Sequence, residues 1–93
     1  MDVLDAFEAR GYLGQFRPDE GGLVECETCE QRFDASQLVV GGYERLEGAS
    51  DPGDMMLVVA GTCPRCSTKG TAVLTYGPMA PRADAEVEAR LVL

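Results

Sequence analysis

Four cysteines, arranged as two pairs, are the residues of this 93-residue chain whose type and spacing could do chemistry. Cys26 and Cys29 form one C-x-x-C motif, and Cys63 and Cys66 form the other. Such a segment can turn back on itself so that both sulfurs face one point. Two of these knuckles facing each other supply four thiolates in a tetrahedron, at metal–sulfur distances of about 2.3 Å for zinc. The motifs therefore predict one closed Cys₄ metal site.

Other chemistries of the same four cysteines remain open. Iron binds the same ligands, and an acidic surface suits an electron carrier. Two redox-active dithiols are a third interpretation, although no βαβ pattern of the thioredoxin type surrounds either motif. Structural disulfides are a fourth, and they belong to oxidising compartments. We favour structural zinc, because a closed four-thiolate site leaves no open position for a substrate.

The motifs and their flanking segments, about residues 22–76, resemble zinc ribbons and, more weakly, rubredoxins. The Cys-Pro-Arg-Cys sequence at 63–66 has the Cys-Pro-x-Cys form common in these families, and Phe33 follows the first pair as an aromatic residue does there. The chain lacks tryptophan and the usual aromatic packing of rubredoxins. The resemblance implies an antiparallel ribbon around one zinc ion, and zinc ribbons frequently contact nucleic acid or the transcription machinery.

One departure from these families concerns the residue after each second cysteine. Zinc ribbons usually place glycine there, where the backbone tends towards positive φ, but this chain has Glu30 and Ser67. A non-glycine residue in that conformation costs on the order of 1–2 kcal/mol. Zinc coordination can contribute about 10–16 kcal/mol to folding. We therefore expect metal binding to survive, with relaxed geometry in one of the knuckles.

The segments that must position the motifs predict an α+β fold. The expected core is a three- or four-stranded antiparallel sheet built on a zinc ribbon, within residues 22–77, flanked by a helix at each end. Strand patterns occur at residues 23–25, 38–46, 55–60 and 71–76. Gly41 and Gly42 predict a bulge or a close backbone approach. Asp34 heads a capping sequence that predicts one helical turn, and Ser50–Gly53 predicts a tight turn.

The first section, residues 1–21, is expected to hold a short helix. Asp2 can cap this helix and Gly11 can end it. Leu4, Phe7 and Ala6 would share its apolar face. We expect Tyr12, Leu13 and Phe16 to cover the core as an irregular continuation, and residues 17–22 to be a turn-rich connector.

The last section, residues 78–93, predicts a helix from Ala80 to Leu93. Its narrow apolar stripe consists of Ala80, Ala83, Val87 and Leu91. The ending Leu91-Val92-Leu93 either packs on the sheet or docks on another chain, in a partner or a homodimer. We treat residues 1–93 as a single domain, because their number suits one small core.

Charge bears on the class of partner. Sixteen acidic and eight basic side chains give a formal net charge of −8. Four thiolates around one Zn²⁺ would bring it to about −10. Because affinity for nucleic acid depends on neutralising phosphates, we expect no appreciable direct binding to DNA or RNA. Around the motifs the charge is uneven: Glu25, Glu27 and Glu30 form an acidic lip, and Arg65, Ser67, Thr68 and Lys69 form a basic and hydroxyl-bearing lip.

Catalysis and membrane insertion find little support in the sequence. The chain has no histidine, no phosphate-binding loop and no carboxylate pair that stands out, so we do not expect an enzyme. The N-terminus does not have the pattern of a secretory signal, and the apolar run at 55–60 is too short to cross a bilayer. These features favour the cytoplasm. An arginine-to-lysine ratio of seven to one, with frequent alanine and glycine, indicates a GC-rich bacterial genome.

The sequence thus predicts a non-enzymatic structural-zinc protein that acts through protein–protein interaction, as an adaptor or accessory subunit of a larger assembly. Two alternatives stay open. One is a transcription- or translation-associated zinc ribbon that contacts nucleic-acid machinery. The other is a rubredoxin-like electron carrier that holds iron.

Overall fold

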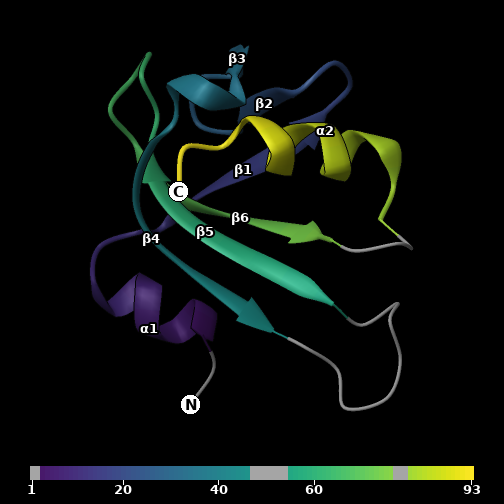
Figure 1. Ribbon diagram of the computed structural model, residues 1–93. Coiled ribbons are helices and arrows are strands. Elements are labelled where there is room, and N and C mark those ends of the chain that lie inside the picture. The colour runs from purple at the N-terminus through teal and green to yellow at the C-terminus, as the bar shows by residue number, and fades with distance from the viewer. Residues whose placement is uncertain (1–2, 47–54, 77–79) are drawn as a thin grey trace.

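The structure is a computed structural model that describes residues 3–46, 55–76 and 80–93. Its two helices and mixed sheet make an α+β fold, as the sequence predicted (Figure 1). No helix in these ranges is long and apolar enough to cross a membrane. In chain order the elements are α1 (Val3–Ala9), β1 (Gly14–Asp19), β2 (Leu23–Cys26), β3 (Arg32–Asp34), the 3₁₀ turn η1 (Ala35–Gln37), β4 (Val39–Leu46), β5 (Met56–Thr62), β6 (Lys69–Thr75) and α2 (Arg82–Arg90).

The strands of the described residues form one six-stranded sheet in the order β3-β2-β1-β6-β5-β4. All neighbouring strands are antiparallel except β1 and β6, which are parallel. The expectation of three or four antiparallel strands is therefore wrong in both number and direction. The strand that the sequence analysis chiefly missed is β1, whose residues were expected to form an irregular segment and a connector.

Two glycines allow β1 and β6 to lie side by side. Gly14 pairs with Gly70 in the parallel register. A Cβ added to Gly70 would lie 2.6 Å from the carbonyl carbon of Gly14, and one added to Gly14 would lie 2.6 Å from Cγ2 of Thr68. Side chains at these positions would force the two backbones apart. The ladder is made at Gly14 and Gln15, so Pro18, which has no N–H to donate, lies beyond it.

Helix α2 and η1 cover one face of the sheet, over the larger apolar core. Val87 of α2 is almost fully buried there. The backbone N–H of Thr75 donates to Oδ2 of Asp84 over 2.8 Å, which ties α2 to the end of β6. The buried members of this core are Phe16, Val24, Cys26, Phe33, Ala35, Leu38, Leu57, Val59, Cys63, Ala72, Leu74, Tyr76 and Val87.

The C-terminal end of α2 is fixed by an ion pair. Nη1 of Arg90 lies 2.6 Å from Oδ2 of Asp34, the residue that caps η1. The Arg90 side chain crosses Gly22, where an added Cβ would lie only 2.4 Å from Cδ of the arginine. The helix spans Arg82–Arg90 rather than the predicted Ala80–Leu93. Within the predicted stripe Val87 is buried and Leu91 packs against the core, while Val92 and Leu93 remain exposed.

Helix α1 packs on the opposite face. Alternation along β5 shows this, because Leu57 and Val59 belong to the α2 core, whereas Val58 and Ala60 contact Phe7 of α1. Adjacent residues of a strand point to opposite faces of the sheet. The second core is small, so α1 leaves much of this face open to solvent.

The predicted bulge in β4 is confirmed, and the aromatic side chains next to α1 explain it. The register between β4 and β5 shifts between Val40 and Gly42. A Cβ on Gly41 would lie 2.1 Å from the Tyr12 hydroxyl oxygen, and one on Gly42 would lie 3.2 Å from the Phe7 ring. The two glycines thus make room for Phe7 and Tyr12 against the edge of the sheet.

The other predicted boundaries are partly correct. Helix α1 is shorter than expected, and Gly11 follows it at φ +97°. Phe16 lies in β1 rather than in an irregular segment, and Arg17–Asp19, expected as a connector, continues that strand. The turn at Asp34 is confirmed, since its carboxylate accepts the N–H of Ser36. Asp2, Ser50–Gly53 and residues 77–79 lie outside the described residues.

Candidate metal centre

The first knuckle lies in the tight connection between β2 and β3. The N–H of Glu30 donates to the carbonyl oxygen of Cys26 over 2.8 Å, and the N–H of Cys26 donates to that of Gln31 over 3.0 Å. Glu30 has φ +58°. This conformation turns the chain sharply enough to place Cys26 and Cys29 on the same side of the loop.

The second knuckle, between β5 and β6, repeats this pattern bond for bond. The N–H of Ser67 donates to Cys63 O over 3.0 Å, and the N–H of Cys63 donates to Thr68 O over 2.8 Å. Ser67 has φ +64°. Sγ of Cys63 also accepts the N–H of Arg65 over 3.4 Å. Both knuckles therefore keep the positive-φ conformation despite lacking glycine, and the expectation that one would relax is wrong.

The four sulfur atoms converge on one point. All four Sγ atoms lie within 4.8 Å of one another. Sγ of Cys26 is 3.8 Å from Sγ of Cys66, and Sγ of Cys29 is 3.9 Å from Sγ of Cys63. A tetrahedron with metal–sulfur bonds of about 2.3 Å has sulfur–sulfur edges of about 3.8 Å. A disulfide would need about 2.05 Å, and all four cysteines are free. The spacing fits a Cys₄ metal site.

The sheet fixes the distance between the two knuckles. Cys26 ends β2 and pairs with Phe16 of β1. The carbonyl oxygen of Gln15, also in β1, accepts the N–H of Glu27 over 3.1 Å. Because β1 pairs with β6 on its other side, it joins the β2–β3 hairpin to the β5–β6 hairpin, and the two connections lie at the same end of the molecule (Figure 1).

The site has a buried side and an exposed side. Cys26 and Cys63, the first cysteine of each knuckle, are buried, Cys29 is half-buried, and Cys66 is exposed. The two buried sulfurs belong to the apolar core. A metal ion here would therefore be anchored to the core on one side and lie close to solvent on the other.

The thiols of the site differ in pKa. The N–H of Gln31 lowers the pKa of Cys29, but partial burial and the three neighbouring thiols raise it to about 12. Burial also raises the pKa of Cys63. Hydrogen bonds with the side chain and then the backbone of Thr68 lower the pKa of Cys66 to about 6. Cys66 is therefore the thiol of these three that ionises most readily.

Thr68 contacts two of the four cysteines, which the sequence analysis did not foresee. Its hydroxyl lies 3.0 Å from Sγ of Cys66, while its carbonyl oxygen closes the second knuckle. The only sequence signal was a hydroxyl residue two positions after the last cysteine. Gln15 was missed altogether, because its role depends on β1.

The acidic lip is partly neutralised by arginines from neighbouring strands. Arg17 of β1 forms an ion pair with Glu27. Nε of Arg32 lies 3.9 Å from Glu25 and 2.8 Å from Asp19. Sequence order alone had not placed these arginines beside the glutamates. The electrostatic contrast between the two lips is therefore smaller than the sequence implied.

The chain was also compared with known proteins. No family model matches it, and neither the curated proteins nor the solved structures yielded a significant match. The zinc-ribbon resemblance therefore rests on the two motifs and on the geometry that brings their sulfurs together.

Proposed function

We propose that Cys26, Cys29, Cys63 and Cys66 hold one structural zinc ion. The main support is the distance between the sulfur atoms, which matches that expected for four sulfurs around one zinc ion. Zinc suits a set of four soft thiolates, and a closed set leaves no position for a substrate. The bound ion would hold the β2–β3 and β5–β6 hairpins together and stabilise the fold.

The protein's task, on this proposal, is interaction with another protein rather than catalysis. A rigid zinc-stabilised sheet of this size suits an adaptor or an accessory subunit in the reducing cytoplasm, where thiolates persist. The lack of histidine anywhere in the chain supports a non-enzymatic role. The formal charge of −8 disfavours direct binding to phosphate backbones, so contact with the transcription or translation machinery would be made through protein.

Elemental analysis of the purified protein tests the metal. We expect one zinc per chain and a colourless solution, and a strong chelator should remove the ion and sharply lower the thermal transition. A red protein with one iron per chain would favour the electron carrier, for which the exposed Cys66 would give a path to solvent. Metal-free protein with an unchanged thermal transition would refute any structural metal.

A fluorescence-anisotropy titration with duplex DNA and with single-stranded RNA tests the nucleic-acid alternative. At physiological salt we expect no appreciable binding. Sub-micromolar, salt-sensitive binding would show that the basic groups near the second knuckle outweigh the net charge.

A further inference from the structure

Among the residues that the structure describes, the large exposed apolar side chains concentrate on the face of the sheet that carries α1. Strand alternation and register place five of them there, outside the small core that Phe7 of α1 forms with Val58 and Ala60. The five are Leu13, Val39, Leu46, Met56 and Val73. The other three, Tyr43, Val92 and Leu93, lie on or near the α2 side. The α1 face is therefore the less completely covered side of the sheet.

The two most exposed of these five lie in one row across four strands. Val39 pairs with Thr62, and Thr62 pairs with Lys69. Leu13 directly precedes Gly14, which pairs with Gly70, so Leu13 lies beside Lys69. The side chain of Leu13 is 74% exposed and that of Val39 is 62% exposed. The row thus presents a cation between two exposed apolar side chains.

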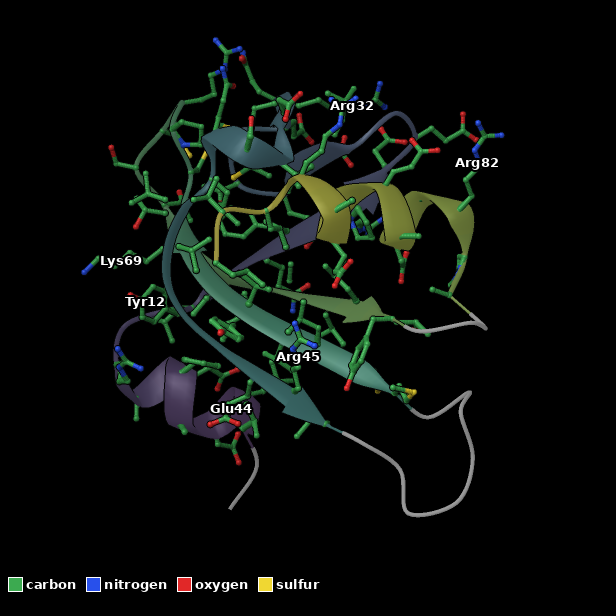
Figure 2. The ribbon with its side chains drawn as sticks, viewed as in Figure 1. Tyr12, Arg32, Glu44, Arg45, Lys69 and Arg82 are labelled. Atoms are coloured by element: carbon green, nitrogen blue, oxygen red, sulfur yellow. The ribbon has the colours of Figure 1, made fainter. Side chains whose placement is uncertain are left out.

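Tyr12 gives this row a rigid edge. Its ring packs edge-on against Phe7, with centroids 6.1 Å apart, and its hydroxyl lies against Gly41. The Arg10 guanidinium lies 5.7 Å from the ring centroid and the Lys69 ammonium lies 5.9 Å from it. Figure 2 shows Lys69 extending away from the ribbon next to Tyr12. Two cations are thus held near one fixed aromatic ring.

These two cations differ from most of the others in the described part of the chain. Arg17, Arg32, Arg82 and Arg90 each form an ion pair with a carboxylate. Among the described residues, neither Arg10 nor Lys69 has a carboxylate oxygen within 4.0 Å, and both instead contact Tyr12. In a chain with twice as many acids as bases, two cations without such partners on one apolar surface are well placed to meet an external carboxylate.

The net charge of −8 does not prevent this. At physiological ionic strength exposed charges are screened beyond about 8 Å. A carboxylate at the row therefore responds chiefly to Lys69 and Arg10. A hollow of about 280 Å³ adjoins Leu13, and its lining includes Glu8 and also Arg17, the partner of Glu27. Its lining also includes the apolar residues Leu4, Leu13 and Val73, which suit an apolar side chain.

We propose that the row surface, defined as Arg10, Tyr12, Leu13, Val39, Thr62 and Lys69, docks an extended acidic segment of a partner protein. Adjacent strands are about 4.8 Å apart, so Leu13 and Val39 are about 14 Å apart across the row. An extended chain covers that distance in about four rises of 3.4 Å, which join five residues with alternate side chains on one face. The fitting pattern is apolar-x-(Asp or Glu)-x-apolar, with the carboxylate at Lys69.

The inference rests on the proposed function, since it names the chemistry of the partner and couples docking to the metal. Lys69 directly follows Thr68, which contacts Cys66 and closes the second knuckle. Metal binding would therefore fix the strand end that carries Lys69.

Amide chemical-shift titration of the purified full chain with a synthetic peptide tests the proposal. The probe carries Leu-Ser-Glu-Ser-Leu, and its twin carries Leu-Ser-Lys-Ser-Leu. Short peptides bind weakly, so a Kd of about 1 mM is expected for the acidic probe. We expect saturable shifts at Leu13, Val39 and Lys69, and at least about tenfold weaker binding of the twin, because like charges would then meet at Lys69.

Two variants and two matched controls sharpen the test. Lys69→Glu should reverse the preference between the two peptides, and Leu13→Asp should abolish binding of the acidic probe. Arg82→Glu and Val92→Asp alter an exposed cation and an exposed apolar side chain elsewhere, so they should leave the affinity unchanged. Each variant is checked for metal content and for an unchanged thermal transition.

Several outcomes would overturn the proposal. They are equal binding of both peptides, shifts confined to another surface, no saturation up to about 10 mM, or displacement of the peptide by a short RNA oligonucleotide. Metal content is measured on the same samples. A metal-free protein that binds the acidic probe would refute the structural metal and its coupling to docking but not the docking surface, whereas a zinc protein that fails to discriminate the peptides would refute only the docking surface.

Discussion

The two knuckles have the same local conformation but very different supports. Each closes through the same two backbone hydrogen bonds, and each has a non-glycine residue at positive φ, Glu30 at 58° and Ser67 at 64°. The first, however, joins strands of four and three residues near one edge of the sheet, whereas the second joins two seven-residue strands.

The difference shows that the conformation of a knuckle and its stabilisation by the sheet have separate causes. The motif and its backbone bonds form the loop locally, wherever it occurs in the sheet. The second loop is held by the seven-pair register between β5 and β6. The first has only three pairs between β2 and β3, and it relies on β1 beside it. We therefore expect the first knuckle to depend more strongly on the metal.

The largest effect should come from replacing one buried sulfur in either knuckle. Cys26→Ser and Cys63→Ser should both lose the ion, because a hydroxyl is a hard ligand and the site needs all four thiolates. Each variant should forfeit most of the roughly 10–16 kcal/mol that zinc can contribute. Elemental analysis and thermal unfolding measure both losses.

Thr28→Ser is the matched control for these variants, since it changes an exposed, non-ligating residue of the first knuckle. It should retain one metal ion per chain and the original thermal transition. If either cysteine variant did the same, the assignment of ligands would be wrong.

Metal removal should destabilise the β2–β3 hairpin more than the β5–β6 hairpin. After chelation, the amides of Cys26 and Glu30 should exchange with solvent at least about tenfold faster than those of Cys63 and Ser67, because local openings follow local contacts. Hydrogen exchange read by NMR measures each amide, with the metal-loaded protein as the reference. Equal loss of protection in both hairpins would show that strand length does not matter.

Acid should weaken metal binding. The thiol of Cys66 should set the pH below which the apparent metal affinity falls more steeply. In the metal-free protein, Cys29, with a pKa of about 12, and Cys63, with a raised pKa, carry protons at neutral pH that the metal must displace. Apparent affinity therefore rises with pH. Below about pH 6, Cys66 is also protonated, so a further proton must leave and the dependence becomes steeper.

Competition with a coloured chelator between about pH 5 and pH 8 measures this dependence. Thr68→Val removes the hydroxyl next to Cys66 and should move the steepening to higher pH. An unchanged profile in that variant would contradict the role assigned to Thr68.

The smallest effect should come from glycine at the two positive-φ positions. Glu30→Gly and Ser67→Gly should each stabilise the metal-loaded protein by about 1 kcal/mol, since glycine adopts this conformation without steric cost. The two gains should be similar, because the two backbones match. Chemical denaturation measures both, and Arg65→Gly, at a position without positive φ, should destabilise instead.

Several features of this fold could be predicted from local sequence. The cysteine spacing identified the four sulfurs that meet, and Asp34 identified the turn that it caps. The bulge at Gly41 and Gly42 was also predictable, although its cause, the Tyr12 hydroxyl and the Phe7 ring, was not. Each of these sequence patterns consists of residues within a few positions of one another, so local rules suffice to recognise it.

The sequence by itself determined which four cysteines meet, the position of the two knuckles and the strand character of β5, because each of these depends on residue type, spacing or an apolar run. The tertiary structure decided how the knuckles meet. Gly14–Asp19 contains a glycine and a proline and has no strand pattern of its own, yet it forms β1. It does so because β2 offers one ladder of backbone partners and β6 another, and because Gly14 and Gly70 let two backbones approach closely. A strand defined by its neighbours cannot be recognised until those neighbours are in place.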